Sequence, residues 1–127
     1  MKRIVWSTDV HLNFVEARVF DEYIGRLEDA AADVVLLSGD IAESGSIVEY
    51  LARLDDRLEC PIYFVLGNHD FYHGSIRRVR EKVCQLCAQR EKLVYLTDSP
   101  LVELSDRTAL IGHDAVSYTH LRAHETG

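Results

Sequence analysis

Three short apolar runs, each followed at once by a polar cluster, constrain most strongly what this chain can fold into. The runs occupy residues 4–8, 34–37 and 62–66. They are short and rich in β-branched and aromatic residues, which is typical of strands. Amphipathic patterns with helical spacing separate them. This alternation predicts an α/β layered fold in which the strands lie parallel.

Three helices are expected around these strands, the second capped by Ser44 or Ser46 and the third by Ser75. Their predicted buried residues recur at helical spacing and are Val19, Tyr23, Leu27 and Ala31; Ile47, Leu51, Leu54 and Leu58; and Ile76, Val79, Val83 and Leu86. We expect Arg77, Arg78 and Arg80 to form a solvated face. Shorter runs at 93–96, 101–104 and 109–111 predict three more strands, with a hairpin turn at 105–107. The predicted order is β-α-β-α-β-α-β-β-β.

Composition narrows the class of protein. A chain of 127 residues suits one domain, and its formal net charge of -7 argues against a broad nucleic-acid-binding surface. Neither a signal peptide nor a membrane-spanning run is visible, so no membrane partner is expected. Three cysteines do not form a disulfide framework, which favours the reducing cytoplasm. Because Cys84 and Cys87 fall within a helical pattern, we interpret them as packing residues rather than a redox pair.

The polar clusters at the strand ends carry the chemistry. They are Asp9-Val10-His11, Gly39-Asp40 and Gly67-Asn68-His69-Asp70. The carboxyl ends of parallel strands lie along one edge of a sheet, where ligands bind. Three clusters that are far apart in sequence are therefore predicted to meet in space.

The residue types in these clusters are those of a metal site. Asp9 and His11 lie two residues apart and point to the same side of an extended chain, so both can bind one cation. The two oxygens of Asp40 can bridge two cations about 3.5–4 Å apart. Asn68 offers a carbonyl oxygen to the second cation. His69 is then free for general acid catalysis.

Asp70 is predicted to fix the tautomer of His69. Each residue also has a simpler interpretation: Asp40 as a helix cap, Asn68 as a turn residue, His11 as a surface histidine. We disfavour these simpler interpretations, because all three would have to hold at the same edge of one sheet.

The clusters match, in order, the signature D-x-H, G-D and G-N-H-[DE] of the calcineurin-like metallophosphoesterases, which the first 114 residues resemble. The resemblance implies an α/β/β/α sandwich of two sheets flanked by helices. It also implies that Asp9, His11 and Asp40 bind a first metal ion and that Asp40 and Asn68 bind a second. The ions would be manganese, iron or zinc, and a hydroxide bridging them would attack phosphorus in line.

The function expected from this resemblance is hydrolysis of phosphate monoesters or diesters. The substrate is left open among phosphorylated small molecules, nucleotides and proteins. The alternative is a protein of the same fold that has lost catalysis and serves as a scaffold for protein contacts. A third class, the aspartyl-phosphate phosphatases, usually carries a second Asp where this chain has His11, and it is therefore disfavoured.

The end of the chain departs from the family pattern, which needs further histidines and a G-H-x-H pair. From Ala115 the sequence has no sustained apolar period and resembles the translated read-through of a sequencing adapter. We therefore expect a truncated domain at 1–114, a non-native tail at 115–127, and no metal site at His120 and His124. The fragment itself is expected to be inactive, with one face of its sheet partly uncovered.

Overall fold

The structure, a computed structural model, describes residues 3–99 and 101–114, and its elements alternate as predicted. The predicted tail with His120 and His124 lies outside the described residues. The strands and α-helices are β1 (Ile4–Ser7), α1 (Ala17–Asp29), β2 (Val34–Ser38), α2 (Ile47–Arg57), β3 (Ile62–Val65), α3 (Ile76–Gln89), β4 (Leu93–Tyr95), β5 (Val102–Glu103) and β6 (Ala109–Leu110). Short 3-10 turns are η1 (Leu12–Phe14), η2 (Asn68–Phe71) and η3 (Leu96–Asp98). Within the described ranges, no helix is long and apolar enough to cross a bilayer.

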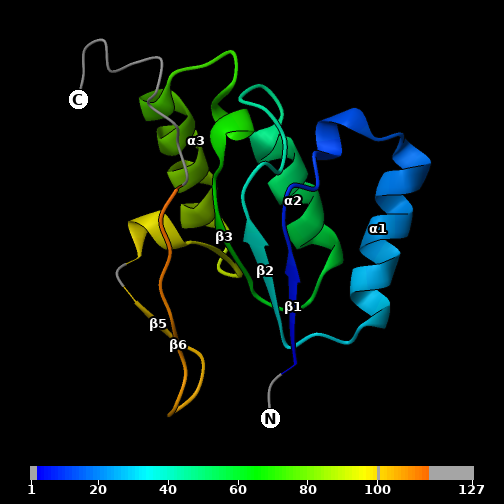
Figure 1. Ribbon diagram of the computed structural model, residues 1–127, viewed down its shortest axis with the longest axis vertical. Coiled ribbons are helices and arrows are strands. Elements are labelled where there is room, and N and C mark those ends of the chain that lie inside the picture. Colours follow the sequence, from blue (N-terminus) through cyan, green and yellow to red (C-terminus); the bar gives the residue numbers. More distant parts are fainter. Residues whose placement is uncertain (1–2, 100, 115–127) are drawn as a thin grey trace.

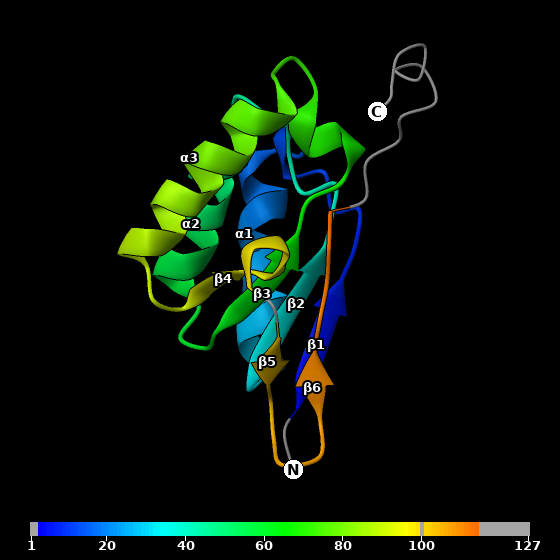
Figure 2. The same ribbon diagram turned by 90° about the vertical axis from the view of Figure 1, so that its left-hand side faces the viewer.

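The first four strands form one parallel sheet in the order β1-β2-β3-β4, and β5 and β6 form a separate antiparallel hairpin. Each parallel strand is joined to the next by a crossover that contains a helix. Because such crossovers are right-handed and the strands follow sequence order, all three helices come to the same face of the sheet. Figures 1 and 2 show this arrangement, with the β5–β6 hairpin away from the helices. The predicted α/β fold is confirmed.

The core lies between the helices and the sheet face that they cover. Alternate strand residues such as Leu37 and Phe64 point into it, as the two-residue period of a strand requires. The face predicted for α2 is confirmed, since its apolar residues are buried. The face predicted for α1 is partly wrong: Phe20 and Ile24 are buried with Leu27, whereas Val19 is exposed. The buried face therefore lies between the predicted row and the neighbouring row through Phe20 and Ile24.

The opposite face of the sheet is only partly covered. Trp6 is 68% exposed and Ile4 is 41% exposed. The Trp6 indole donates a hydrogen bond to Ser38 Oγ across the neighbouring strand at 2.8 Å. Near the other edge, the backbone at Gly112 lies against the side chains of Val65 and Leu96. The segment after β6 therefore covers part of this face near β3, while the β1 side lies open.

Helix α3 shows two confirmed predictions and one correction. Ser75 caps it as predicted, because the Ser75 hydroxyl accepts a hydrogen bond from the Arg78 amide at 3.0 Å. Cys84 and Cys87 pack against the core, which agrees with their predicted packing role. The prediction that Arg80 lies on the solvated face is wrong, because its guanidinium turns to Asp114 at 2.9 Å and lies over the Phe71 ring.

Candidate metal centre

The polar segments after β1 and β2 run side by side. The amide of Asp9 donates to the Gly39 carbonyl at 3.1 Å, and that of His11 donates to the Asp40 carbonyl at 3.0 Å. Leu12 continues the series with a 2.7 Å bond to Ile41. Parallel pairing thus extends beyond the strands themselves and brings the first two clusters together, as predicted.

Asp70 ties the third cluster to the second. One oxygen of its fully buried carboxylate accepts hydrogen bonds from the amides of Ile41 and Ala42 at 2.9 and 2.7 Å. The other oxygen accepts from the Gly67 amide at 2.9 Å. Burial raises the pKa of Asp70 to about 6, although these three donors act in the opposite direction. The expectation that Asp70 orients His69 is therefore corrected, because both of its oxygens are directed to backbone amides of the two loops.

Asp40 occupies the place expected for Asp70 beside His69. Its Oδ1 accepts a hydrogen bond from the His69 amide at 2.9 Å. Its Oδ2 lies 3.2 Å from His69 Nδ1. A single carboxylate therefore holds both the backbone and the ring of His69 within the site.

His11, Asp40 and His69 form a group with metal-binding geometry. One ligand atom from each lies within 4.8 Å of the other two. Nδ1 of His11 and Nδ1 of His69 are both buried and have no hydrogen-bond partner. A buried nitrogen without a partner is costly unless something else satisfies it. Two such nitrogens beside a carboxylate are a donor set suited to a transition-metal ion.

Asp9 and Asn68 lie next to this group. The Thr8 hydroxyl donates to Asp9 Oδ2 at 2.8 Å. This bond lowers the pKa of Asp9, and a hydrogen bond shared with the Asp40 carboxyl lowers it further. Asn68 begins the η2 turn that also carries His69 and is half-buried. Metal binding by Asp9 and Asn68 stays a prediction.

The backbone of the site is strained. Asp9, His11 and Asp40 adopt left-handed conformations with φ angles of 55°, 45° and 51°. Such conformations cost of order 1–3 kcal/mol for residues other than glycine and persist where surrounding contacts impose them, often at functional sites. Three of them lie at the strand ends that carry the predicted ligands, and two others are at Ala31 and His73.

Two glycines allow the loops to approach each other. A Cβ on Gly67 would lie 2.8 Å from the Asp40 backbone nitrogen, closer than real Cβ atoms come. Gly39 has a φ angle of +111° and lies against the Gly67 backbone. The G-D and G-N-H-D motifs therefore need their glycines because the two loops are in contact.

Asp114 is a structural residue that the sequence analysis missed. Its side chain is fully buried, and Oδ1 accepts hydrogen bonds from the Leu66 amide and the Thr97 hydroxyl, both at 2.8 Å. Oδ2 accepts from Arg80 and from the Tyr95 hydroxyl. Leu66 directly precedes the G-N-H-D cluster, so this network fixes the base of the third loop. The only local signal is an Asp following a strand, which does not reveal partners so distant in sequence.

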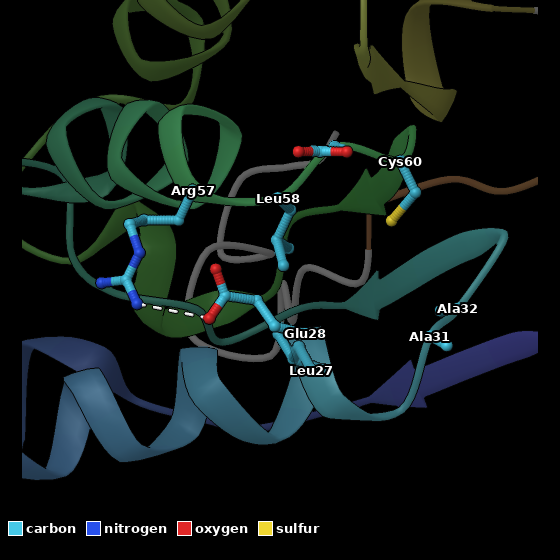
Figure 3. Close-up of a pocket in the computed structure, with 8 residues that line it drawn as sticks. Leu27, Glu28, Ala31, Ala32, Arg57, Leu58 and Cys60 are labelled. Carbon is cyan, nitrogen blue, oxygen red and sulfur yellow. Dashed lines mark hydrogen bonds and ion pairs between the residues drawn. The ribbon is translucent and has the colours of Figure 1, made fainter.

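A cavity of about 350 Å³ lies at the opposite edge of the sheet (Figure 3). It lies between the end of α1 and the segment after α2, and the residues that line it include Leu27, Leu58 and Cys60. Arg57 and Glu28, which also line it, form an ion pair at 3.4 Å. These segments precede β2 and β3, so the cavity is at the amino ends of the strands, away from the metal-binding group.

Comparisons with known proteins agree with the geometry. A family model for the calcineurin-like phosphoesterases matches residues 2–123. An uncharacterized metallophosphoesterase of Campylobacter jejuni is 29% identical over 57% of this chain and 20% of its own length. A protein of Synechococcus named a probable cyclic nucleotide phosphodiesterase is 45% identical over 36% of this chain and 19% of its own length. The chain thus spans about a fifth of the length of these curated relatives. The search of solved structures found no significant match.

Proposed function

The chain belongs to the calcineurin-like phosphoesterase family, and from this premise we propose that its domain hydrolyses phosphate monoesters or diesters with two bound metal ions. The observation that carries the proposal is the group of His11, Asp40 and His69, whose ligand atoms lie within 4.8 Å of one another at the carboxyl edge of the sheet. Phosphate esters and metal ions both suit such an edge, because ligands of parallel sheets bind there.

Each side chain has a proposed task. Asp9, His11 and Asp40 would hold one ion, and Asp40 and Asn68 would hold a second, with manganese, iron or zinc as the candidates. When bound, such ions make a water molecule more acidic and neutralise charge on phosphate oxygens. His69 directs Nδ1 toward Asp40, so its Nε2 would carry the proton for the leaving oxygen of the ester.

The alternative of a scaffold without catalysis is less consistent with the site. A scaffold has no need of three left-handed residues and of two buried imidazole nitrogens without a hydrogen bond at one place. Both features cost folding free energy, and a bound cation would offset the cost of the nitrogens.

The substrate and the compartment are part of the proposal. The name of the Synechococcus relative makes cyclic nucleotides a useful class to test beside simple esters. The cysteines Cys60, Cys84 and Cys87 are free thiols, which suits a reducing cytoplasm.

The proposed activity is tested with a purified protein that contains this domain. Hydrolysis of para-nitrophenyl phosphate, its bis-ester and 3′,5′-cyclic nucleotides would be measured with manganese, iron or zinc and after chelation. We expect metal-dependent turnover that Asp40→Asn lowers by roughly a hundredfold or more, as expected when a metal-binding group is lost. Asp106→Asn, on the exposed β5–β6 turn, is the matched control and should leave the rate unchanged. Turnover that survives both chelation and Asp40→Asn would refute the proposal.

The 127-residue chain alone should be nearly inactive in the same assay. Its described residues supply only Asp9, His11, Asp40, Asn68 and His69 as ligand-type side chains at the site. Two ions need more protein ligands than these, so the second ion would be held weakly. A rate typical of an enzyme from the 127-residue chain would contradict this expectation.

A further inference from the structure

We propose that a cavity between the loops that precede α2 and α3 binds a phosphate group, at a site separate from the metal centre. The cavity has a volume of about 410 Å³, and its lining includes Ser44, His73, Ser75, Arg78 and Lys82. The Ser44 amide donates a 3.3 Å hydrogen bond to the Tyr72 carbonyl, which holds the two loops together. The inference goes beyond the proposed function, because this site needs no metal ion.

Two cations on this cavity have no acidic partner. The ion pairs of α3 join Arg77 to Glu81 at 3.4 Å and Arg80 to Asp114 at 2.9 Å. Within the part of the chain that the structure describes, Arg78 and Lys82 form none. Glu81 also lines the cavity, but its charge is already offset by Arg77. In a chain with a formal net charge of -7, this local excess of positive charge favours an anion.

Lys82 is held at the cavity by a backbone contact. Its ammonium donates to the Ser44 carbonyl at 3.0 Å. This bond joins α3 to the loop after β2, and it uses one of the three protons that a lysine can donate. The remaining donors of Lys82 are therefore available to a ligand in the cavity.

A buried hydroxyl on the cavity has no hydrogen-bond partner. Ser44 is 7% exposed. Its hydrogen bonds within the described ranges involve its amide and its carbonyl, and none involves Oγ. A Cβ on Gly74 would lie 2.8 Å from Ser44 Oγ, so the glycine leaves the hydroxyl uncovered on this side. A buried hydroxyl without a partner costs free energy, and an oxygen of a bound anion would satisfy it.

The first turn of α3 adds further donors. This helix has 14 residues, and its N-cap Ser75 lines the cavity. The first amides of a helix have no partner within the helix, and the helix dipole favours negative charge beside them. The Ser75 hydroxyl satisfies one of these amides, that of Arg78. The end of the helix therefore supports the charge of Arg78 and Lys82.

Phosphate suits this set of groups better than a cation or a carboxylate. A guanidinium, an ammonium and a hydroxyl are all donors, and a phosphate has more acceptor oxygens than a carboxylate to receive them. Two positive charges without acidic partners repel a metal ion. The chemical class of the ligand is therefore a phosphate group.

The cavity lies beside the metal centre. The Tyr72 ring is 4.5 Å from the His69 ring and 6.3 Å from the His73 ring, measured between centroids. His69 belongs to the metal-binding group, and His73 lines the cavity. Two sources would therefore bring a phosphate group here. One is the second phosphate of a substrate whose ester lies at the metal centre, and the other is a separate phosphorylated ligand.

The test is a titration of the ¹⁵N-labelled 127-residue chain with inorganic phosphate, with a chelator present to keep metal ions out of the metal centre. We expect the amides of residues 44–45 and 73–75 to shift together. Arg78→Gln and Lys82→Gln should each weaken phosphate binding roughly tenfold, because each removes a charged donor. Arg26→Gln, at an exposed arginine of α1, is the matched control and should bind phosphate as the unmodified chain does.

Two further variants separate binding from folding. Ser44→Ala should leave the free energy of unfolding without phosphate unchanged or raise it, since the hydroxyl has no partner to lose, and should still weaken phosphate binding. Glu81→Gln should strengthen binding, because it removes a negative charge from the lining. The inference is overturned if phosphate shifts no amide of the two loops. It is also overturned if Arg78→Gln, Lys82→Gln and Ser44→Ala all keep the affinity of the unmodified chain.

The source of the phosphate group is determined with a purified, metal-loaded protein that contains this domain. KM is compared for adenosine 3′,5′-bisphosphate and adenosine 3′-monophosphate. If Arg78→Gln raises KM for the bisphosphate alone, the cavity holds the second phosphate of the substrate. If it changes neither KM but abolishes binding of inorganic phosphate, the ligand is a separate molecule. A rise in both KM values would place the reacting phosphate in the cavity and overturn the inference of a separate site.

Failure of this inference is distinguishable from failure of the proposed function. A metal-free chain that binds no phosphate, beside metal-dependent hydrolysis that Asp40→Asn abolishes, would overturn the inference alone. Phosphate binding that Arg78→Gln weakens, beside hydrolysis that needs no metal, would overturn the proposed function alone.

Discussion

At the scale of single residues, the site depends on two glycines at positions that leave no room for a Cβ atom. The loops after β2 and β3 touch through Gly39 and Gly67, which places Asp40 against the backbone of the third loop. The ligand-type residues are predictable from the sequence, because Asp, His and Asn directly after successive strands are typical of a metal site. Their packing is not predictable in this way, because it depends on backbone contacts between loops that are distant in sequence.

Gly67→Ala is expected to destabilise the metal-free chain by about 2 kcal/mol, because the new Cβ would lie 2.8 Å from the Asp40 nitrogen. Gly25→Ala is the matched control, since nothing lies within 4 Å of a Cβ at that helical position. This control should stabilise the chain by up to about 1 kcal/mol. Urea unfolding measures both. Equal effects of the two substitutions would show that the loops do not approach as described.

Cys87 should be almost unreactive in the folded chain. Burial is the main cause that raises its pKa to about 12 from 9.0, and the neighbouring Cys84 adds to the shift. At pH 8 the thiolate is then scarcer than in the unfolded chain, so alkylation by iodoacetamide should be at least about tenfold slower than in urea. Because the folded chain keeps this proton longer, the group lowers stability as pH rises above 9. Mass spectrometry of the labelled chain checks the rate, and fast labelling of native Cys87 contradicts it.

At the scale of elements, the helix predictions succeed where one face is unambiguous and fail where two are possible. In α1, a four-residue row through Val19 and Tyr23 and a neighbouring row through Phe20 and Ile24 both contain apolar residues. Phe20 and Ile24 of the second row are buried, whereas Val19 of the first row is exposed, although Leu27 of the first row is buried as well. One residue rotates a helix by about 100°, so tertiary packing decides between them. The strand order and the hairpin are predictable because turns and apolar runs mark them locally.

The buried carboxylates cannot be assigned partners from sequence. Asp70 accepts from backbone amides of the loop after β2, and Asp114 accepts from α3, β4, η3 and the residue after β3. Both residues join elements, and neither pairing follows any local spacing. Polar groups of this kind are satisfied by whatever the fold brings near them, which a pattern of residue types does not encode.

Asp114→Ala should destabilise the chain by about 3 kcal/mol, because it leaves Arg80 and two hydroxyls without their buried acceptor. Asp106→Ala, in the exposed turn of the hairpin, should change stability by less than about 0.5 kcal/mol. Chemical denaturation of both variants gives the comparison. If Asp114→Ala lowers stability no more than Asp106→Ala does, the network does not hold the third loop.

At the scale of the whole molecule, one face of the sheet is packed under three helices and the other is partly open. The family resemblance predicts this difference, because it implies a second sheet, and the described residues leave Trp6 and Ile4 exposed. Ordinary domains avoid broad exposed apolar surface because it promotes association. The solvent accessibility of side chains on the open face therefore tests whether this face is covered.

Trp6 is the sole tryptophan of the chain and is 68% exposed. Its fluorescence should be red-shifted and readily quenched by acrylamide in dilute solution. Trp6→Lys should reduce self-association seen by light scattering at high concentration, because it places a charge on the open face. Blue-shifted emission that resists quenching at the lowest usable concentration would show that this face is covered.

The central claim is that the loops after β1, β2 and β3 together form one metal-binding site. The most direct measurement is Mn²⁺ titration of the ¹⁵N-labelled chain, since bound Mn²⁺ broadens nearby amide signals. We predict that the amides of residues 9–12, 39–42 and 67–70 broaden together at substoichiometric Mn²⁺. Those around Cys60, at the opposite edge, should remain sharp. Broadening confined to a single loop, or spread over exposed acidic side chains instead, would contradict the account.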